Sequence, residues 1–148
     1  MFAWTPRQLW AWRRIVLRAF GARIGSHVHI HPTARIQIPW NLVVEDHAAI
    51  GDRAIIYNLG VITIGRSATI SQNAHLCAGS HDLRDPAMKL LKLPIIIGDG
   101  AWICADAFIG PGVRVHDGAV VGARAVVIRD VAENTVVAGN PAVVVNVR

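Results

Sequence analysis

The side chains best suited to chemistry in this sequence are histidines, and one of the seven stands apart. His81 belongs to the run Ser80-His81-Asp82, with Arg84 close behind it. An imidazole titrates near neutral pH, so it can take a proton from a weak nucleophile, and it is also a common metal ligand. Which of the two roles His81 has depends on what the fold brings beside it.

A zinc site is one reading of these histidines. The γ-type carbonic anhydrases hold zinc with three histidines and a water in the fourth position, and His75 and His81 are candidate ligands here. His27, His29 and His31 alternate along the chain. The chain repeats every six residues and these three fall at different positions of the repeat, so we do not expect them to converge. We therefore expect no metal, and a carbonic anhydrase-like metalloenzyme is kept as an alternative.

The elements that must position these side chains follow a period of six. From residue 97 to residue 131 each unit of six begins with Ile or Val and has Ala or Val in its fifth place. This period fits neither an α-helix nor a flat two-faced strand, and it is typical of a β-helix in which each unit supplies one short strand and a turn. The aliphatic residues are expected to point into a shared core. The first places are Ile97, Ile103, Ile109, Val115, Val121 and Val127.

The repeat starts at Ile24 and is interrupted three times. Two interruptions add two residues each, and a turn that bulges outward absorbs such an insertion without shifting the core register. These insertions are centred on Pro39-Trp40-Asn41 and on Asn58-Leu59-Gly60. The third is too long for one turn, so we expect residues 80–94 to leave the coil as a loop with His81 at its root. Function usually lies on such loops.

The charge of the chain is confined to its first residues. The arm 1–23 holds five arginines and no acid, whereas ten basic and ten acidic residues follow it, so the whole net charge of +5 belongs to the arm. A neutral body argues against a nucleic-acid-binding protein. The expected organisation is a basic amphipathic helix or cap over 1–23 and one β-helix domain over 24–148.

Thr5 and Pro6 predict the start of a helix of about fifteen residues, and Gly21 predicts its end. One reading is a cap on the open end of the coil, which every such stack needs. The other is an interfacial helix that meets lipid phosphates through one arginine face, with its tryptophans at the headgroup level. The two roles can coexist. The arginines of that face are Arg7, Arg14 and Arg18.

Composition suggests the compartment. No apolar run reaches the roughly 18 residues of a membrane span. The two cysteines, Cys77 and Cys104, cannot make a disulfide framework and have no ligand spacing. A reducing cytoplasm is the natural setting.

With these residues in view, the sequence resembles a known family. The hexapeptide run, Ser80-His81-Asp82 before an excised loop, the GAWI that opens the second run and the closing AGNPA are similar to the left-handed β-helix O-acetyltransferases. The arm and the stretch from Pro39 to Gly65 resemble the exopolysaccharide (colanic acid type) branch in particular, which is related to nodulation, maltose and galactoside acetyltransferases. The resemblance covers nearly the whole chain. It implies an all-β fold: a single-stranded left-handed parallel β-helix with a short N-terminal α-helix and one excised loop. Left-handedness comes from the resemblance alone, because parallel crossovers are usually right-handed.

The resemblance implies an acetyl-CoA-dependent O-acetyltransferase that acts on a sugar hydroxyl in cell-surface polysaccharide biosynthesis. A hydroxyl is a poor nucleophile, so a base must take its proton as it attacks the thioester, and His81 matches the base of the family. Transfer would be direct, without an acyl-enzyme. Asn58 matches an acceptor contact, with a turn residue as the other reading. Asp82 and Arg84 are further substrate-binding candidates, and Asp82 or Asp85 is expected to orient the imidazole.

The resemblance also implies a homotrimer with coenzyme A in a groove between neighbouring coils. Backbone groups at Ala105 and Ala123, one three-sided coil apart, would bind the pantetheine arm. The family often has a basic residue after AGNPA, where this chain has Val143, so the phosphates would rest on Arg129, or on Arg124 or Arg148. The expected cofactor contacts are Trp102, Ala105, Ala123, Arg129, Asn140 and Pro141.

The acceptor itself is not identified by the sequence. A free, a nucleotide-linked and a lipid-linked sugar all remain open, and an antibiotic or other xenobiotic acetyltransferase of the same fold is a second alternative. For a lipid-linked sugar, a cytoplasmic enzyme would gain by lying against the inner membrane face through its N-terminal helix.

Overall fold

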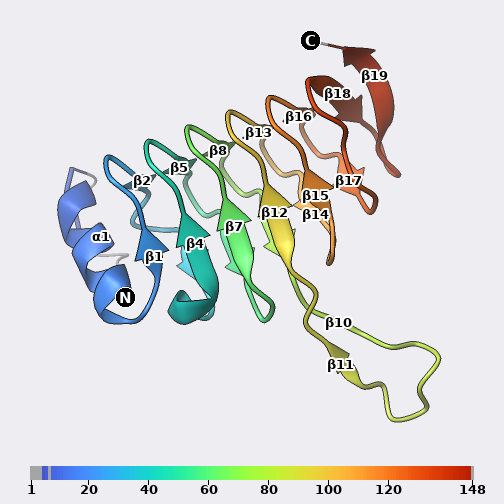
Figure 1. The fold of residues 1–148 in the computed structure, drawn as a ribbon, viewed down its shortest axis with the longest axis horizontal. Helices are drawn as coiled ribbons and strands as arrows, with labels where there is room; N and C mark the ends of the chain where they lie inside the picture. Colours follow the sequence, from blue (N-terminus) through green and yellow to red (C-terminus); the bar gives the residue numbers. More distant parts are fainter. Residues whose placement is uncertain (1–4, 7, 148) are drawn as a thin grey trace.

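The computed structural model describes residues 5–6 and 8–147, and Arg7 and Arg148 lie outside these residues. The chain winds into a parallel β-helix with three walls, each a sheet to which every coil adds one short strand (Figure 1). We name the walls A, B and C in the order in which the chain reaches them. α1 (Trp10–Ala19) lies across the N-terminal end of the coil. The predicted fold of one short helix and a solenoid of strands is confirmed.

From β1 to β17 the strands follow walls A, B and C in rotation, apart from β10 and β11, which form a separate sheet. Wall A consists of β1 (Arg23–Ile24), β4 (Leu42–Val44), β7 (Ile62–Ile64), β12 (Ile95–Ile97) and β15 (Arg114–Val115). Wall B consists of β2 (His29–Ile30), β5 (Ala49–Ile50), β8 (Thr69–Ile70), β13 (Trp102–Ile103), β16 (Val120–Val121), β18 (Thr135–Ala138) and the antiparallel β19 (Val143–Val147). Wall C consists of β3 (Arg35–Ile36), β6 (Ile55–Tyr57), β9 (His75–Cys77), β14 (Phe108–Ile109) and β17 (Val126–Val127).

The core is the column of aliphatic side chains that the repeat predicts. On wall B, Ile30, Ile50, Ile70 and Ile103 stand in register and are at most 2% exposed. Burying one such side chain stabilises the fold by roughly 1.5–3 kcal/mol. Because each strand contributes one inward residue, stability accumulates coil by coil along the axis.

The register locates every insertion at one corner. Ile97 pairs with Val115, one regular coil later, whereas Ile24 pairs with Val44, twenty residues on. The two extra residues lie between walls C and A, where η1 (Pro39–Asn41) forms, and the second insertion repeats this one coil later. The excised loop leaves from the same place. We call this edge corner CA, and the edges between the other walls corners AB and BC.

The N-terminal helix differs from its prediction at the start and agrees at the end. It begins at Trp10 and not at Pro6, because residues 5–6 are held by Arg13, whose Nη1 donates to Thr5 Oγ1 and to the Pro6 carbonyl at 3.0 Å each. Gly21 follows the helix with a φ of +88°, which favours glycine, as expected for a helix stop. None of the helices in the described part of the chain is long and apolar enough to span a bilayer.

The arginine face of α1 turns toward the coil. Arg18 Nε donates to the Ile24 carbonyl at 2.8 Å, and Arg14 Nη1 donates to the Val28 carbonyl at 3.1 Å. The arginines therefore cap backbone carbonyls of the first coil. These bonds fit the cap reading of the helix, and lipid-phosphate binding by Arg14 and Arg18 stays a prediction.

Candidate active site

The excised loop is a β-hairpin that projects from corner CA (Figure 1). β10 (Ser80–His81) pairs antiparallel with β11 (Leu90–Leu91), and His81 stands opposite Leu90. The Asp82 N–H donates to the Lys89 carbonyl at 2.9 Å and extends the pairing toward the tip. His81 therefore lies on a short strand near the root of the hairpin, and its side chain is exposed.

One hydrogen bond defines the chemistry available to the imidazole. His81 Nδ1 lies 2.5 Å from the carbonyl oxygen of Met88. A carbonyl oxygen only accepts, so Nδ1 carries a proton, and in the neutral form of the ring the lone pair of Nε2 is then free. This is the tautomer that a general base needs.

The nearby carboxylates shape the hairpin and do not orient the ring. Asp82 Oδ1 accepts the Arg84 N–H at 2.9 Å, and Asp85 Oδ1 accepts the Ala87 N–H, also at 2.9 Å. Both are turn-forming bonds two residues along the chain. The expectation that Asp82 or Asp85 orients His81 is not met. Asp82 and Arg84 lie on the hairpin beyond His81, and Arg84 is exposed.

The root of the hairpin rests on the insertion of the coil before it. A Cβ on Gly79 would lie 2.9 Å from Leu59 Cδ1 and 3.0 Å from Tyr57 Cε1. At the other end of the hairpin, a Cβ on Gly60 would lie 2.8 Å from the Leu93 carbonyl oxygen. The backbone thus approaches closely at both places, and glycine permits it.

Asn58 fastens the insertion at residues 58–60, on which the hairpin rests, to the coil before it. Its side chain is fully buried, and its amide pairs with the backbone of Ile38 one coil below: Nδ2 donates to the carbonyl at 2.5 Å and Oδ1 accepts the N–H at 3.0 Å. Asn41 Nδ2 donates in turn to the Leu59 carbonyl at 2.9 Å. A buried, engaged carboxamide does not face an acceptor, so the geometry favours the structural reading of Asn58.

Sequence reasoning placed Asn41 in an insertion without giving it a role, and it missed two other residues of this corner. Tyr57 was detectable in principle, because it borders the second insertion at corner CA. Met88 was not, because it acts through its backbone carbonyl, and any residue type offers one.

Two of the expected cofactor contacts lie at corner BC. Ala105 and Ala123 occupy equivalent turns of successive coils, and the Arg124 N–H donates to the Ala105 carbonyl at 2.9 Å. The predicted spacing of one coil is confirmed. Trp102 lies on wall B and leans toward this corner, with Nε1 donating to Ser71 Oγ at 2.9 Å. Its ring is about half exposed.

The other expected cofactor contacts gather at the C-terminal end. Arg129 and Pro141 line one cleft of about 400 Å³, together with Val143. The turn that contains Asn140 and Pro141 covers the last strand of wall C, since the Ala142 N–H donates to the Val126 carbonyl at 2.9 Å. The cofactor candidates thus form two groups, neither of which lies on the hairpin that carries His81.

Four other histidines have partners elsewhere on the coil. His27 stacks on His47 at corner AB with ring centroids 5.0 Å apart, while His29 packs on Trp10 at 5.1 Å. His31 Nδ1 lies 3.1 Å from Asp52 Oδ1 at corner BC. No group of three potential metal ligands occurs within residues 5–6 and 8–147.

His75 belongs to the outer face of wall C. It pairs with Phe108 on the next strand, and the two rings lie edge to face with their centroids 5.3 Å apart. Burial lowers the pKa of His75 below its ordinary value. An imidazole kept neutral against an aromatic ring is a packing element, so this geometry favours a structural role.

Comparisons with known proteins agree with this geometry. A family model described as bacterial transferase hexapeptide (six repeats) matches residues 94–129. The chain is 46% identical over 148 residues to the protein named colanic acid biosynthesis acetyltransferase WcaF of Escherichia coli (strain K12), across 100% of this chain and 81% of the relative.

Solved structures share the whole architecture. A maltose O-acetyltransferase from Clostridium difficile 630 has a TM-score of 0.88 at 26% identity and covers 99% of this chain and 80% of its own. The hexapeptide-repeat acetyltransferase VCA0836 from Vibrio cholerae O1 biovar eltor was solved with acetyl coenzyme A. Its TM-score is 0.85 at 28% identity, and the match covers 93% of this chain and 76% of VCA0836. The left-handed coil implied by the resemblance is confirmed. The chain therefore belongs to the bacterial hexapeptide-repeat transferases, within the acetyltransferase family that includes WcaF.

Proposed function

We propose that this chain is an acetyl-CoA-dependent O-acetyltransferase that modifies a sugar hydroxyl in cell-surface polysaccharide biosynthesis, with His81 as its general base. The family supports the reaction class, and a relative named for colanic acid biosynthesis supports the pathway. The observation that carries the role of His81 is the bond from Nδ1 to the Met88 carbonyl, which leaves Nε2 ready to accept a proton.

The step is a direct transfer. Nε2 takes the hydroxyl proton while the sugar oxygen attacks the thioester carbonyl, and the new carbon–oxygen bond gives a tetrahedral intermediate. The carbon–sulfur bond breaks as this intermediate collapses. The imidazolium then returns the proton to the departing thiolate of coenzyme A. Such general-base help contributes roughly 10²–10⁴ in rate. A backbone N–H is the expected donor to the oxygen of the tetrahedral intermediate.

A homotrimer with shared sites accounts for the split between His81 and the cofactor candidates. His81 rises from corner CA, whereas Ala105 and Ala123 lie at corner BC, the opposite edge of wall C. One wall is roughly 15 Å wide at the usual rise per residue of a strand. A neighbour that brings its corner BC to this chain's corner CA would close the gap, and threefold symmetry would repeat the contact.

The outer face of wall C has the composition of such an interface. The column begins with the exposed Arg35 at the N-terminal end and continues in register with Ile55, His75, Phe108 and Val126, and these four are half-buried in the single chain. Leu83 on the hairpin is 85% exposed, which is unusual for a leucine that stays in water. Both features support wall C facing the threefold axis with the hairpin against a neighbour.

Two further assignments complete the proposal. We assign the enzyme to the cytoplasm, where acetyl-CoA is available and where free thiols such as Cys77 and Cys104 stay reduced. The acceptor is a sugar that is nucleotide-linked or lipid-linked before export. Arg129 and the turn at Asn140 and Pro141 are assigned to the cofactor phosphates and adenosine, because they share a cleft at the C-terminal end.

The activity is tested by thiol release from acetyl-CoA with nucleotide-linked sugars, lipid-linked sugars and chloramphenicol as acceptors. Release that depends on a sugar acceptor supports the proposal. Release that depends on chloramphenicol alone would move the enzyme to antibiotic modification, and no release with any acceptor would count against the reaction class.

The shared site is tested by co-expression of two inactive chains. One carries His81→Ala and the other carries Ala123→Trp, a bulky residue at corner BC. If each site takes His81 from one chain and corner BC from its neighbour, random assembly restores about one quarter of the sites. A mixture that stays inactive, or a monomer by light scattering with activity intact, would contradict the trimeric site.

A further inference from the structure

The N-terminal end of the coil presents apolar side chains to the outside. α1 lies across that end, so its outer face points away from the solenoid along the axis (Figure 1). On this helix Trp12 is 52% exposed and Ile15 is 57% exposed, one turn apart, with Leu9 and Phe20 nearly as exposed at the two ends. Contiguous apolar patches of this kind mark contact with a partner or a membrane.

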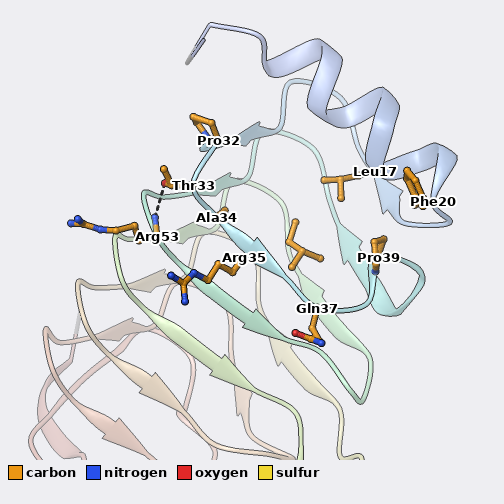
Figure 2. A pocket seen from close by; sticks show the side chains of 10 residues that line it. Leu17, Phe20, Pro32, Thr33, Ala34, Arg35, Gln37, Pro39 and Arg53 are labelled. Atoms are coloured by element: carbon orange, nitrogen blue, oxygen red, sulfur yellow. Dashed lines mark hydrogen bonds between the residues drawn. The ribbon is translucent and has the colours of Figure 1, made fainter. Parts of the chain in front are cut away.

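A cleft opens beside this helix, where the described residues of the cap leave part of the coil end uncovered. α1 packs on β1 and β2, and a cleft of about 670 Å³ lies between the end of α1 and β3 (Figure 2). Ile36 is only half-buried there, whereas Ile56, the equivalent residue of the next coil, is fully buried. Leu17 and Pro39 complete an apolar lining. The open end of the hydrophobic core is therefore reachable from outside.

The rim of the cleft is cationic. Arg35 and Arg53 line it, and Figure 2 shows both side chains extending away from α1. Arg53 is 63% exposed although its Nε donates to Asn73 Oδ1 at 3.1 Å and lies 3.5 Å from an oxygen of Asp52. The first 44 residues of the sequence contain six arginines and no acid. An apolar cleft with a cationic rim matches an amphiphile that has an acyl chain and an anionic head.

We infer that the N-terminal end of the β-helix is a docking face for an anionic phospholipid bilayer. Trp12 and Ile15 enter the interface, an acyl chain occupies the cleft, and Arg35 and Arg53 meet lipid phosphates. Arg14 and Arg18 have a different task, since they fasten α1 to the coil. In the proposed trimer the three coil axes are parallel, so three such faces lie on one side of the assembly and meet one plane together.

Co-sedimentation of the full chain with vesicles tests this inference independently of the acetyltransferase reaction. Phosphatidylcholine vesicles are compared with vesicles that also contain phosphatidylglycerol. The wild type is expected to bind the anionic vesicles, and less so as salt rises. Trp12→Gln with Ile15→Gln should weaken binding at least ~10-fold through lost apolar burial. Arg35→Gln should weaken it about 5-fold.

The matched control is Ile128→Gln, because Ile128 is 59% exposed toward the opposite end of the coil. It should bind vesicles like the wild type, and the Trp12 and Ile15 variant should keep acetyl transfer to a water-soluble acceptor. Equal, negligible binding of the wild type to both vesicles would overturn the inference. A lower oligomer mass of the Trp12 and Ile15 variant by light scattering would assign the face to a second copy of the chain instead.

Discussion

The side-chain amide of Asn58 makes two hydrogen bonds to the backbone of Ile38, one to its carbonyl and one from its N–H. This pairing joins the insertions of two successive coils. The hairpin that carries His81 rests on the second of them, through the close approaches at Gly79 and Gly60. The position of the proposed base is therefore set by three stacked interruptions of the repeat at one corner.

Asn58→Ala should destabilise the fold without a specific defect in acceptor binding. It leaves the partly buried N–H and carbonyl of Ile38 without their side-chain partner, which costs about 2–4 kcal/mol for the two groups. Chemical denaturation measures this loss. Asn146→Ala, on the exposed β19, is the control and should stay within about 0.5 kcal/mol of the wild type. A stable Asn58→Ala protein with a raised KM for the sugar would restore the acceptor role.

Gly60→Ala should impair acetyl transfer more than Gly79→Ala. A Cβ on Gly60 meets the backbone of Leu93, which cannot move without the hairpin, whereas a Cβ on Gly79 meets only the ends of the Leu59 and Tyr57 side chains. A displacement of about 1 Å at a catalytic group lowers the rate by roughly 10-fold or more. Steady-state kinetics of the two variants give the comparison. Equal activities would mean that the contact between Gly60 and Leu93 does not position His81.

Arg18→Gln should loosen the helical cap. The change removes the bonds from Arg18 to the carbonyls of Ile24 and Gly25 and leaves the apolar contacts of α1 in place. Because Arg18 is exposed, we expect a loss of about 1 kcal/mol in the free energy of unfolding. Arg23→Gln, on the outer face of wall A, is the matched control. Thermal unfolding followed by circular dichroism distinguishes them, and identical melting curves would contradict the capping role.

His75 should make stability fall in mild acid. Burial lowers its pKa in the folded chain, so at low pH the unfolded state binds a proton that the folded state resists. Its contribution is fully present above the unfolded pKa of about 6.5 and is lost as the pH falls below that value. His75→Phe should flatten this part of the curve, measured by denaturation at several pH values. An unchanged slope would mean that another group titrates there.

The sequence predicted the parts of this structure that depend on repetition. Six-residue spacing identifies inward residues such as Ile103 because every coil imposes the same geometry, and the eight-residue steps located the insertions at Asn41 and Asn58. The orientation of His81 was beyond such reasoning, because its partner is a backbone carbonyl brought back by a hairpin turn. A helical wheel groups Arg14 and Arg18 on one face of α1, but it does not tell which side of the helix meets the coil.

Acetyl transfer by His81→Ala is the most direct test of the account. The variant removes the base and leaves both cofactor regions intact, so it should bind coenzyme A like the wild type while its rate of transfer falls at least ~10²-fold. Calorimetry measures the binding, and thiol release measures the rate at saturating acetyl-CoA. Transfer near the wild-type rate in a folded variant would contradict the role of His81.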